Sequence, residues 1–112
     1  MEGKVLYATL YRQWFDQVAR GTKKTEYRQM SDYWVKKLVD VERYAGKDVA
    51  EIKNGIVGGK LTPYWRDWTH VRFKCGNNYV VCEIKGISVY RGHDVFCIKL
   101  GKVTPQNGAV NQ

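Results

Sequence analysis

The residues whose types and spacing best suit chemistry lie in one short charged segment, residues 21–28 (GTKKTEYR). Lys23 and Arg28 can each hold a phosphate or a carbonyl oxygen, and Glu26 can accept a hydrogen bond from the amino group of a base. The same carboxylate can equally form a structural ion pair with Arg28 or with a lysine. The segment therefore predicts either a polar cleft or a charge pair that holds the fold together.

A predicted amphipathic helix, residues 12–20, comes directly before this segment. At helical spacing it carries one apolar stripe, formed by Trp14, Phe15, Val18 and Ala19. Gly21 follows, and a glycine at this position commonly ends a helix with a positive φ. We therefore expect the chain to turn sharply at Gly21 into the next element.

Residues 23–28 (KKTEYR) are short and contain Thr and Tyr, which predicts a strand. On a regular strand, Lys23 and Glu26 point to opposite faces. Because Gly21 is close, we expect a bend near Lys23 and Lys24 that lets Lys23 and Glu26 share one cleft.

The remaining chain predicts an α+β fold with a small barrel of mostly antiparallel strands, flanked by two or three helices. The further expected elements are a strand at 5–11, a helix from the cap Ser31 to Leu38, a helical turn at 48–53 capped by Asp48, and consecutive strands at 69–75, 79–90 and 95–100. Gly55, Gly58, Gly59 and Pro63 predict a loop of about fifteen residues before Trp65. We expect one domain over residues 1–103 and a disordered tail over 104–112.

The pattern G-x-K-x-x-E-x-R over residues 21–28, after a strand and an aromatic helix, resembles the ASCH family of the PUA-like superfamily. Residues 95–103 (VFCIKLGKV) also look like the last strand of that family, which often ends in Leu-Gly-Lys. The resemblance covers residues 4–28 well and 69–103 loosely. It implies a PUA-like β-barrel, a cleft beside the motif and a role linked to RNA.

Two enzymatic activities are also implied by this resemblance: RNA cleavage that depends on or is stimulated by metal, and hydrolysis of the amide in N4-acylated cytidines. In the amidohydrolase branch, a motif Lys acts with a Thr three positions later and with a distant Glu. The Lys corresponds to Lys23, but Glu26 stands at the Thr position and Thr25 is one place short. Glu51 and Glu83 are candidates for the distant acid. For an enzyme we therefore expect catalysis by Lys23 and Glu26, with Thr25 as a further candidate.

Composition points to a polyanionic partner. The chain has 19 Lys and Arg against 11 Asp and Glu, a formal charge of +8, and 13% aromatic residues. A basic, aromatic-rich domain suits a polyanion whose bases can stack. Trp65 and Trp68 lie in a turn-rich stretch where a buried Trp is less expected. We expect binding through these two residues and through Lys24, Tyr27 and Arg28.

Several classes of protein are disfavoured. Cys75, Cys82 and Cys97 are odd in number and lack CxxC spacing, which argues against a disulfide framework and a zinc site. The segment NGIVGGK (54–60) lacks the spacing of a phosphate-binding P-loop. No apolar run approaches a membrane span and no signal sequence is evident, so we expect a cytoplasmic protein without a membrane partner.

These observations favour a domain that binds single-stranded RNA or a modified nucleoside in a basic, aromatic-lined cleft. A small hydrolase on the same cleft, either a ribonuclease or an N4-acylcytidine amidohydrolase, is the alternative. A protein-interaction module is the third. No cofactor is expected, except a divalent metal if the protein is a ribonuclease.

Overall fold

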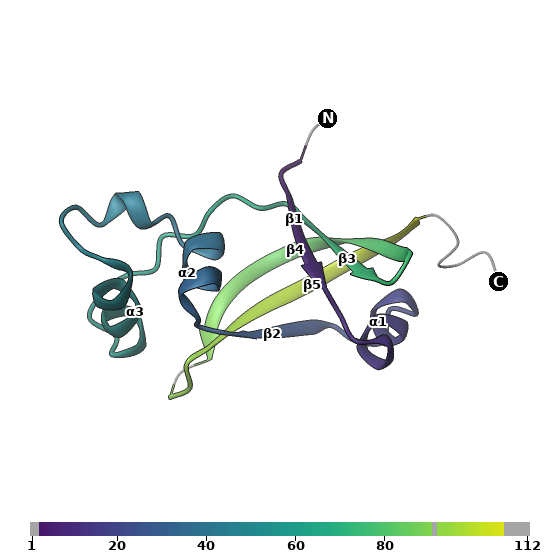
Figure 1. Ribbon diagram of the computed structural model, residues 1–112, viewed down its shortest axis with the longest axis horizontal. Coiled ribbons are helices and arrows are strands. Elements are labelled where there is room, and N and C mark those ends of the chain that lie inside the picture. The colour runs from purple at the N-terminus through teal and green to yellow at the C-terminus, as the bar shows by residue number, and fades with distance from the viewer. Residues whose placement is uncertain (1–2, 91, 107–112) are drawn as a thin grey trace. The chain divides into compact units, whose positions relative to one another are not determined.

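The computed structural model describes residues 3–90 and 92–106 and shows an α+β fold (Figure 1). In chain order its elements are β1 (Val5–Thr9), α1 (Arg12–Ala19), β2 (Thr25–Gln29), α2 (Asp32–Leu38), a 3-10 turn (Val41–Arg43), α3 (Val49–Val57), β3 (His70–Cys75), β4 (Asn78–Tyr90) and β5 (Val95–Gln106). Within the described residues the strands form a five-stranded mixed sheet in the order β1-β3-β4-β5-β2. The predicted α+β class is confirmed, and the strand content fits a small barrel-like sheet.

The chain divides into two compact units, each built from separate segments. Within the described residues, the first unit contains 3–26, 68–86 and 98–106. The second contains 27–67, 87–90 and 92–97. The strands β2, β4 and β5 each contribute residues to both units.

In the first unit, β1 pairs in parallel with β3, and β3 pairs antiparallel with β4. The expected antiparallel hairpin of β3 and β4 is confirmed, with Gly76 at φ 61° in its turn. The parallel pairing of β1 with β3 was not anticipated, because the residue pattern of a strand indicates which face is buried but not which strand lies beside it. The buried side chains of this unit come from the sheet and from α1, and they include Leu6, Phe15, Val18, Val71, Phe73, Val80 and Cys82.

The end of α1 is closed by a glycine turn. The Thr22 N–H donates to the Gln17 carbonyl at 3.0 Å, and the Gly21 N–H donates to the Val18 carbonyl at 2.9 Å. This pair of bonds is a Schellman motif, which needs the positive φ of 78° found at Gly21. The Lys23 N–H also donates to the Gln17 carbonyl, at 3.2 Å, so β2 begins two residues later than expected. This is the bend that the sequence predicts.

In the second unit, capping residues begin both helices as expected. Ser31 accepts from the Trp34 N–H at 3.2 Å, and Asp48 forms a capping box with Glu51. The helix α3 continues to Val57, four residues beyond the predicted turn. Gly55 lies within this helix, and the Leu61 side chain packs where a Cβ at this position would project. The predicted loop is therefore shorter than expected.

The buried Tyr44 holds the loop after α3 in place through two hydrogen bonds within the second unit. The Tyr44 hydroxyl donates to the Thr62 carbonyl at 2.6 Å and accepts from the Tyr64 N–H at 2.7 Å. Burial raises the pKa of Tyr44, although its backbone hydrogen bond to Tyr64 acts in the opposite direction. The residues after α3 thus have a defined path despite their turn-rich composition.

The strand β5 runs to Gln106, so the first residues of the predicted tail belong to the sheet. The rest of that tail, residues 107–112, lies outside the described residues. Among the helices that the structure describes, none combines the length and apolarity needed to cross a membrane.

The glycine turn can be tested by substitution. We expect Gly21→Ala to lower the free energy of unfolding by about 1 kcal/mol, because an added Cβ is strained at positive φ even in open space. The matched control is Gly86→Ala, since Gly86 also has open space around the added Cβ but no positive φ. We expect the control to change stability by less than about 0.5 kcal/mol. Urea unfolding measures both, and equal effects would contradict the assigned turn.

Candidate functional site

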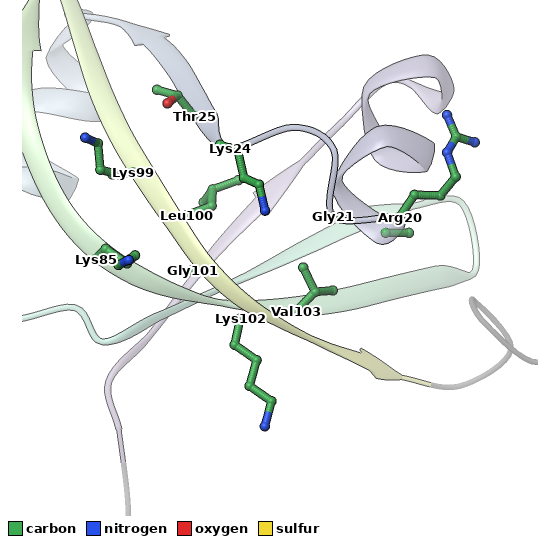
Figure 2. A pocket seen from close by; sticks show the side chains of 11 residues that line it. Arg20, Gly21, Lys24, Thr25, Lys85, Lys99, Leu100, Gly101, Lys102 and Val103 are labelled. Carbon is green, nitrogen blue, oxygen red and sulfur yellow. The ribbon is translucent and has the colours of Figure 1, made fainter.

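The first unit contains a basic pocket of about 680 Å³. Figure 2 shows that its lining residues come from the end of α1, the start of β2, and from β4 and β5. Its basic residues, which we call the basic cluster, are Arg20, Lys24, Lys85, Lys99 and Lys102. The other lining residues are Ala19, Gly21, Thr25, Leu100, Gly101 and Val103.

Backbone contacts position the walls of this pocket. The Schellman turn at the end of α1 places Arg20 and Gly21 in one wall of the pocket. The Leu100 N–H donates to the Lys24 carbonyl at 2.9 Å, which holds the start of β2 beside β5. The lining therefore combines segments that lie more than seventy residues apart in the chain.

Gly101 leaves room for side chains from β4. A Cβ at this position would lie 2.9 Å from Cγ of Lys85 and 3.0 Å from Oε1 of Glu83. The same Glu83 oxygen accepts from the Lys102 N–H at 3.2 Å. Glu83 thus holds the backbone of β5 beside the pocket through this hydrogen bond. Because Gly101 has no side chain, the Lys85 side chain can lie against β5.

The pocket suits an anion. All five residues of the basic cluster are exposed, and no carboxylate residue is among the described lining residues. Like charges around one hollow repel one another, and a bound anion relieves that repulsion. Lysines present compact, solvated charges that pair well with phosphate oxygens.

An ion pair lies at the bend that precedes β2. Nζ of Lys23 is 3.6 Å from Oε1 of Glu26, and these side chains are 15% and 7% exposed. The Lys23 amine also lies 5.1 Å from the centre of the Trp14 ring. The structure therefore brings together the two residues expected to be catalytic and adds an aromatic face to them. Thr25, the further candidate, lies between them in sequence and lines the basic pocket.

The other expected binding residues are placed differently. Lys24 lines the basic pocket, and Trp68 is a half-buried residue of the first unit. Tyr27, Arg28 and Trp65 belong to the second unit. Convergence of Lys23, Glu26 and Arg28 in one cleft stays a prediction.

Within the second unit, each of these residues has an aromatic neighbour. The Arg28 guanidinium lies 5.0 Å from the Trp34 ring, and the exposed Tyr27 lies 6.4 Å from Tyr90. Trp65 meets Phe96 edge-on at 5.8 Å. It also lines a separate pocket of about 340 Å³ between the end of α3, residues 59–63 and residues 87–89.

Sequence reasoning missed most of the pocket. It selected Lys24 and Thr25 but not Arg20, Lys85, Lys99 or Lys102. The Leu-Gly-Lys of residues 100–102 was recognised only as the end of a strand. The available signal was the density of lysines on β5, but only the pairing of β5 with β2 places them at one pocket. Trp14 was expected in the apolar stripe of α1, yet it is 40% exposed and faces a cation.

Both acids suggested for a distant catalytic role, Glu51 and Glu83, form structural hydrogen bonds. Glu51 completes the capping box of α3 in the second unit. Glu83 accepts from the backbone of β5 in the first unit. In the described part of the chain, no group of three or more His, Cys, Asp and Glu residues is placed to hold a metal ion.

Comparison of the chain with protein-family models, with curated proteins and with solved structures gave no match.

The cysteines differ in environment. Cys82 is buried in the first unit, and burial raises the pKa of its thiol to about 12. Burial also raises the pKa of the Cys97 thiol, against the opposing effect of a hydrogen bond to Ser88. Cys75 is half-buried. A thiolate nucleophile at Cys82 is disfavoured by this environment.

The Cys82 environment predicts a pH-dependent difference in labelling. Raising the pH from about 7 to about 9 increases the thiolate fraction of an ordinary cysteine, whereas a thiol with a raised pKa stays protonated over that range. We expect iodoacetamide to modify Cys75 first, and Cys82 only after unfolding in urea. Mass spectrometry of the digested protein measures each site. Labelling of native Cys82 that accelerates with pH as fast as that of a short cysteine-containing peptide would contradict the assignment.

Proposed function

We propose that this protein binds single-stranded RNA, with phosphates of the strand in the basic pocket of the first unit. The observation that carries this proposal is the basic cluster itself: five exposed cations around one pocket that no described carboxylate residue lines. The formal charge of +8 adds a long-range attraction for any polyanion.

The size of the pocket supports a ligand of nucleotide size. Pockets for small molecules typically measure about 300–1,000 Å³. At about 680 Å³, this one lies within that range. The pocket is therefore also large enough for a modified nucleoside, either free or within a strand.

The resemblance to the ASCH family also supports an RNA ligand. The α+β fold with a mixed sheet and the helix–turn–strand geometry around residues 21–28 support assignment to a PUA-like barrel. On that assignment, the G-x-K-x-x-E-x-R motif lies beside the basic pocket through Gly21 and Lys24.

Salt dependence tests the pocket directly. If about four phosphates are neutralised, the slope of log K against log salt concentration should be about −3, at roughly 0.7 for each contact on a single strand. We expect Lys24→Gln with Lys102→Gln to reduce the magnitude of that slope to about 1.4, because two contacts are lost. Fluorescence anisotropy with a labelled oligouridylate measures both values.

The matched control is Lys36→Gln with Lys47→Gln. These two lysines are exposed and lie outside the basic pocket, and their loss lowers the formal charge by the same two units. We expect the control double variant to keep most of the slope. Equal losses in the two double variants would show that net charge alone drives binding, and the pocket assignment would fail.

The Lys23–Glu26 pair supports a second candidate function, that of a hydrolase. A carboxylate held 3.6 Å from an amine can accept a proton from an attacking water, and the amine can stabilise the developing oxyanion. Because Glu26 stands where the amidohydrolase branch has Thr, the Thr-dependent mechanism does not transfer, and an acid–base mechanism is the one proposed.

Single substitutions separate the hydrolase from the binding module. We expect Lys23→Ala and Glu26→Gln to lower kcat by about 100-fold or more if the pair acts in proton transfer. The substrates are N4-acetylcytidine and single-stranded RNA, the latter with added Mg²⁺. Lys36→Ala is the matched control, and thermal melts monitor folding. Absence of turnover by the unmodified protein would reject the hydrolase and leave RNA binding untouched.

A further inference from the structure

One face of the sheet in the first unit carries two tyrosines and an arginine in contact. Cζ of Arg72 lies 3.7 Å from the centre of the Tyr79 ring and 5.6 Å from that of Tyr7. The three residues, which we call the stacking triad, come from β3, β4 and β1 respectively. They belong to no pocket described above.

Strand alternation explains why these side chains gather there. Tyr7 is paired with Arg72 across β1 and β3, and Tyr79 is paired with Lys74 across β3 and β4. Their sequence neighbours Leu6, Val71, Phe73 and Val80 are buried. Because alternate residues of a strand point to opposite faces, the stacking triad and Lys74 occupy the face turned away from that core.

We infer that this face is a second nucleic-acid site, at which an unpaired base stacks on Tyr7, Arg72 and Tyr79 and Lys74 contacts a phosphate. Tyr7 lies on an edge strand of the sheet, and its side chain is 61% exposed. Tyrosine rings and guanidinium planes on an open sheet are the surfaces on which single-stranded bases stack. Arg72 is already oriented by two rings, so little conformational freedom is lost when a base binds.

The face continues toward the basic pocket. Along β4, Tyr79, Val81, Glu83 and Lys85 alternate with buried or half-buried neighbours. Tyr79 and Lys85 are thus about 20 Å apart along one side of the strand, at roughly 3.3 Å for each residue. A short single strand can therefore place a base on the stacking triad and a phosphate at the basic cluster. The inference rests on the proposed function for its ligand class but uses different residues.

Paired substitutions test the stacking itself. We expect Tyr7→Leu with Tyr79→Leu to weaken binding of an octameric oligouridylate by about tenfold or more, because base–aromatic stacking is lost. The matched control, Tyr7→Phe with Tyr79→Phe, keeps both rings and should bind as the unmodified protein does. An abasic octamer keeps the phosphates and removes the bases, so its affinity should be the same for all three proteins.

Equal affinity of the Leu and Phe double variants for the oligouridylate would overturn the inference. A second measurement serves if the Leu double variant fails to fold. In the unmodified protein, the Arg72 side-chain Nε–Hε resonance should shift when a uridine trinucleotide is added, and an unchanged resonance would overturn the inference. The same shift on addition of octaglutamate would also overturn it, because the face would then recognise carboxylates through charge.

The two proposals can fail separately. Binding of the abasic octamer that depends on Lys24 and Lys102, together with equal affinity of the Leu and Phe variants for oligouridylate, would support the pocket and reject the stacking site. No binding of the abasic octamer, together with a trinucleotide-dependent shift at Arg72, would reject the pocket and support the stacking site.

Discussion

The left-handed turn at Gly21 is the constraint on which the candidate site depends. It closes α1 through two backbone hydrogen bonds to Gln17 and Val18, and a third bond from Lys23 holds the chain against the helix for one residue more. The Lys23 side chain leaves this bend beside Trp14 and lies within reach of Glu26. The same turn contributes Arg20 and Gly21 to the basic pocket. One residue with access to positive φ therefore positions both an ion pair and one wall of the basic pocket.

Lys23 and the basic cluster, both in the first unit, differ in their electrostatic surroundings. Lys23 is largely buried, lies near a carboxylate and faces an aromatic ring, so its charge is compensated within the protein. The basic cluster is exposed, and its mutual repulsion is weakened by solvent and salt, which allows these charges to gather without a large cost to the fold. This difference separates Lys23, whose charge is compensated within the protein, from cations whose charges are open to solvent. Because exposed charges are screened by ions, the proposed binding through the basic cluster would depend strongly on salt.

The two faces of the sheet in the first unit carry different kinds of side chain. One face supplies Leu6, Val71, Phe73 and Val80 to the core against which α1 packs. The other presents the stacking triad, in which an arginine is held between two tyrosine rings. Burial of the first face stabilises the strands, and their alternation then fixes the direction of the second set of side chains. Recognition of a base at this face would therefore require no rearrangement of the backbone.

Local features of this protein were determined by the sequence itself. The helix before Gly21, the caps at Ser31 and Asp48, and the hairpin at Gly76 each depend on bonds between residues a few positions apart, so their residue types predict them. The bend near Lys23 was expected from the same glycine turn, whereas the choice of Lys23 as the ion-pair partner of Glu26 was left open by the sequence. The extension of α3 past Gly55 was not predicted, because the residue types do not show that Leu61 packs into the space that this glycine leaves. The parallel pairing of β1 with β3 was likewise decided only by the tertiary structure, as was the lining of one pocket by Arg20, Lys24, Lys85, Lys99 and Lys102. The physical reason is that strand pairing joins segments distant in the chain, and no local propensity records which lysines will then share one pocket.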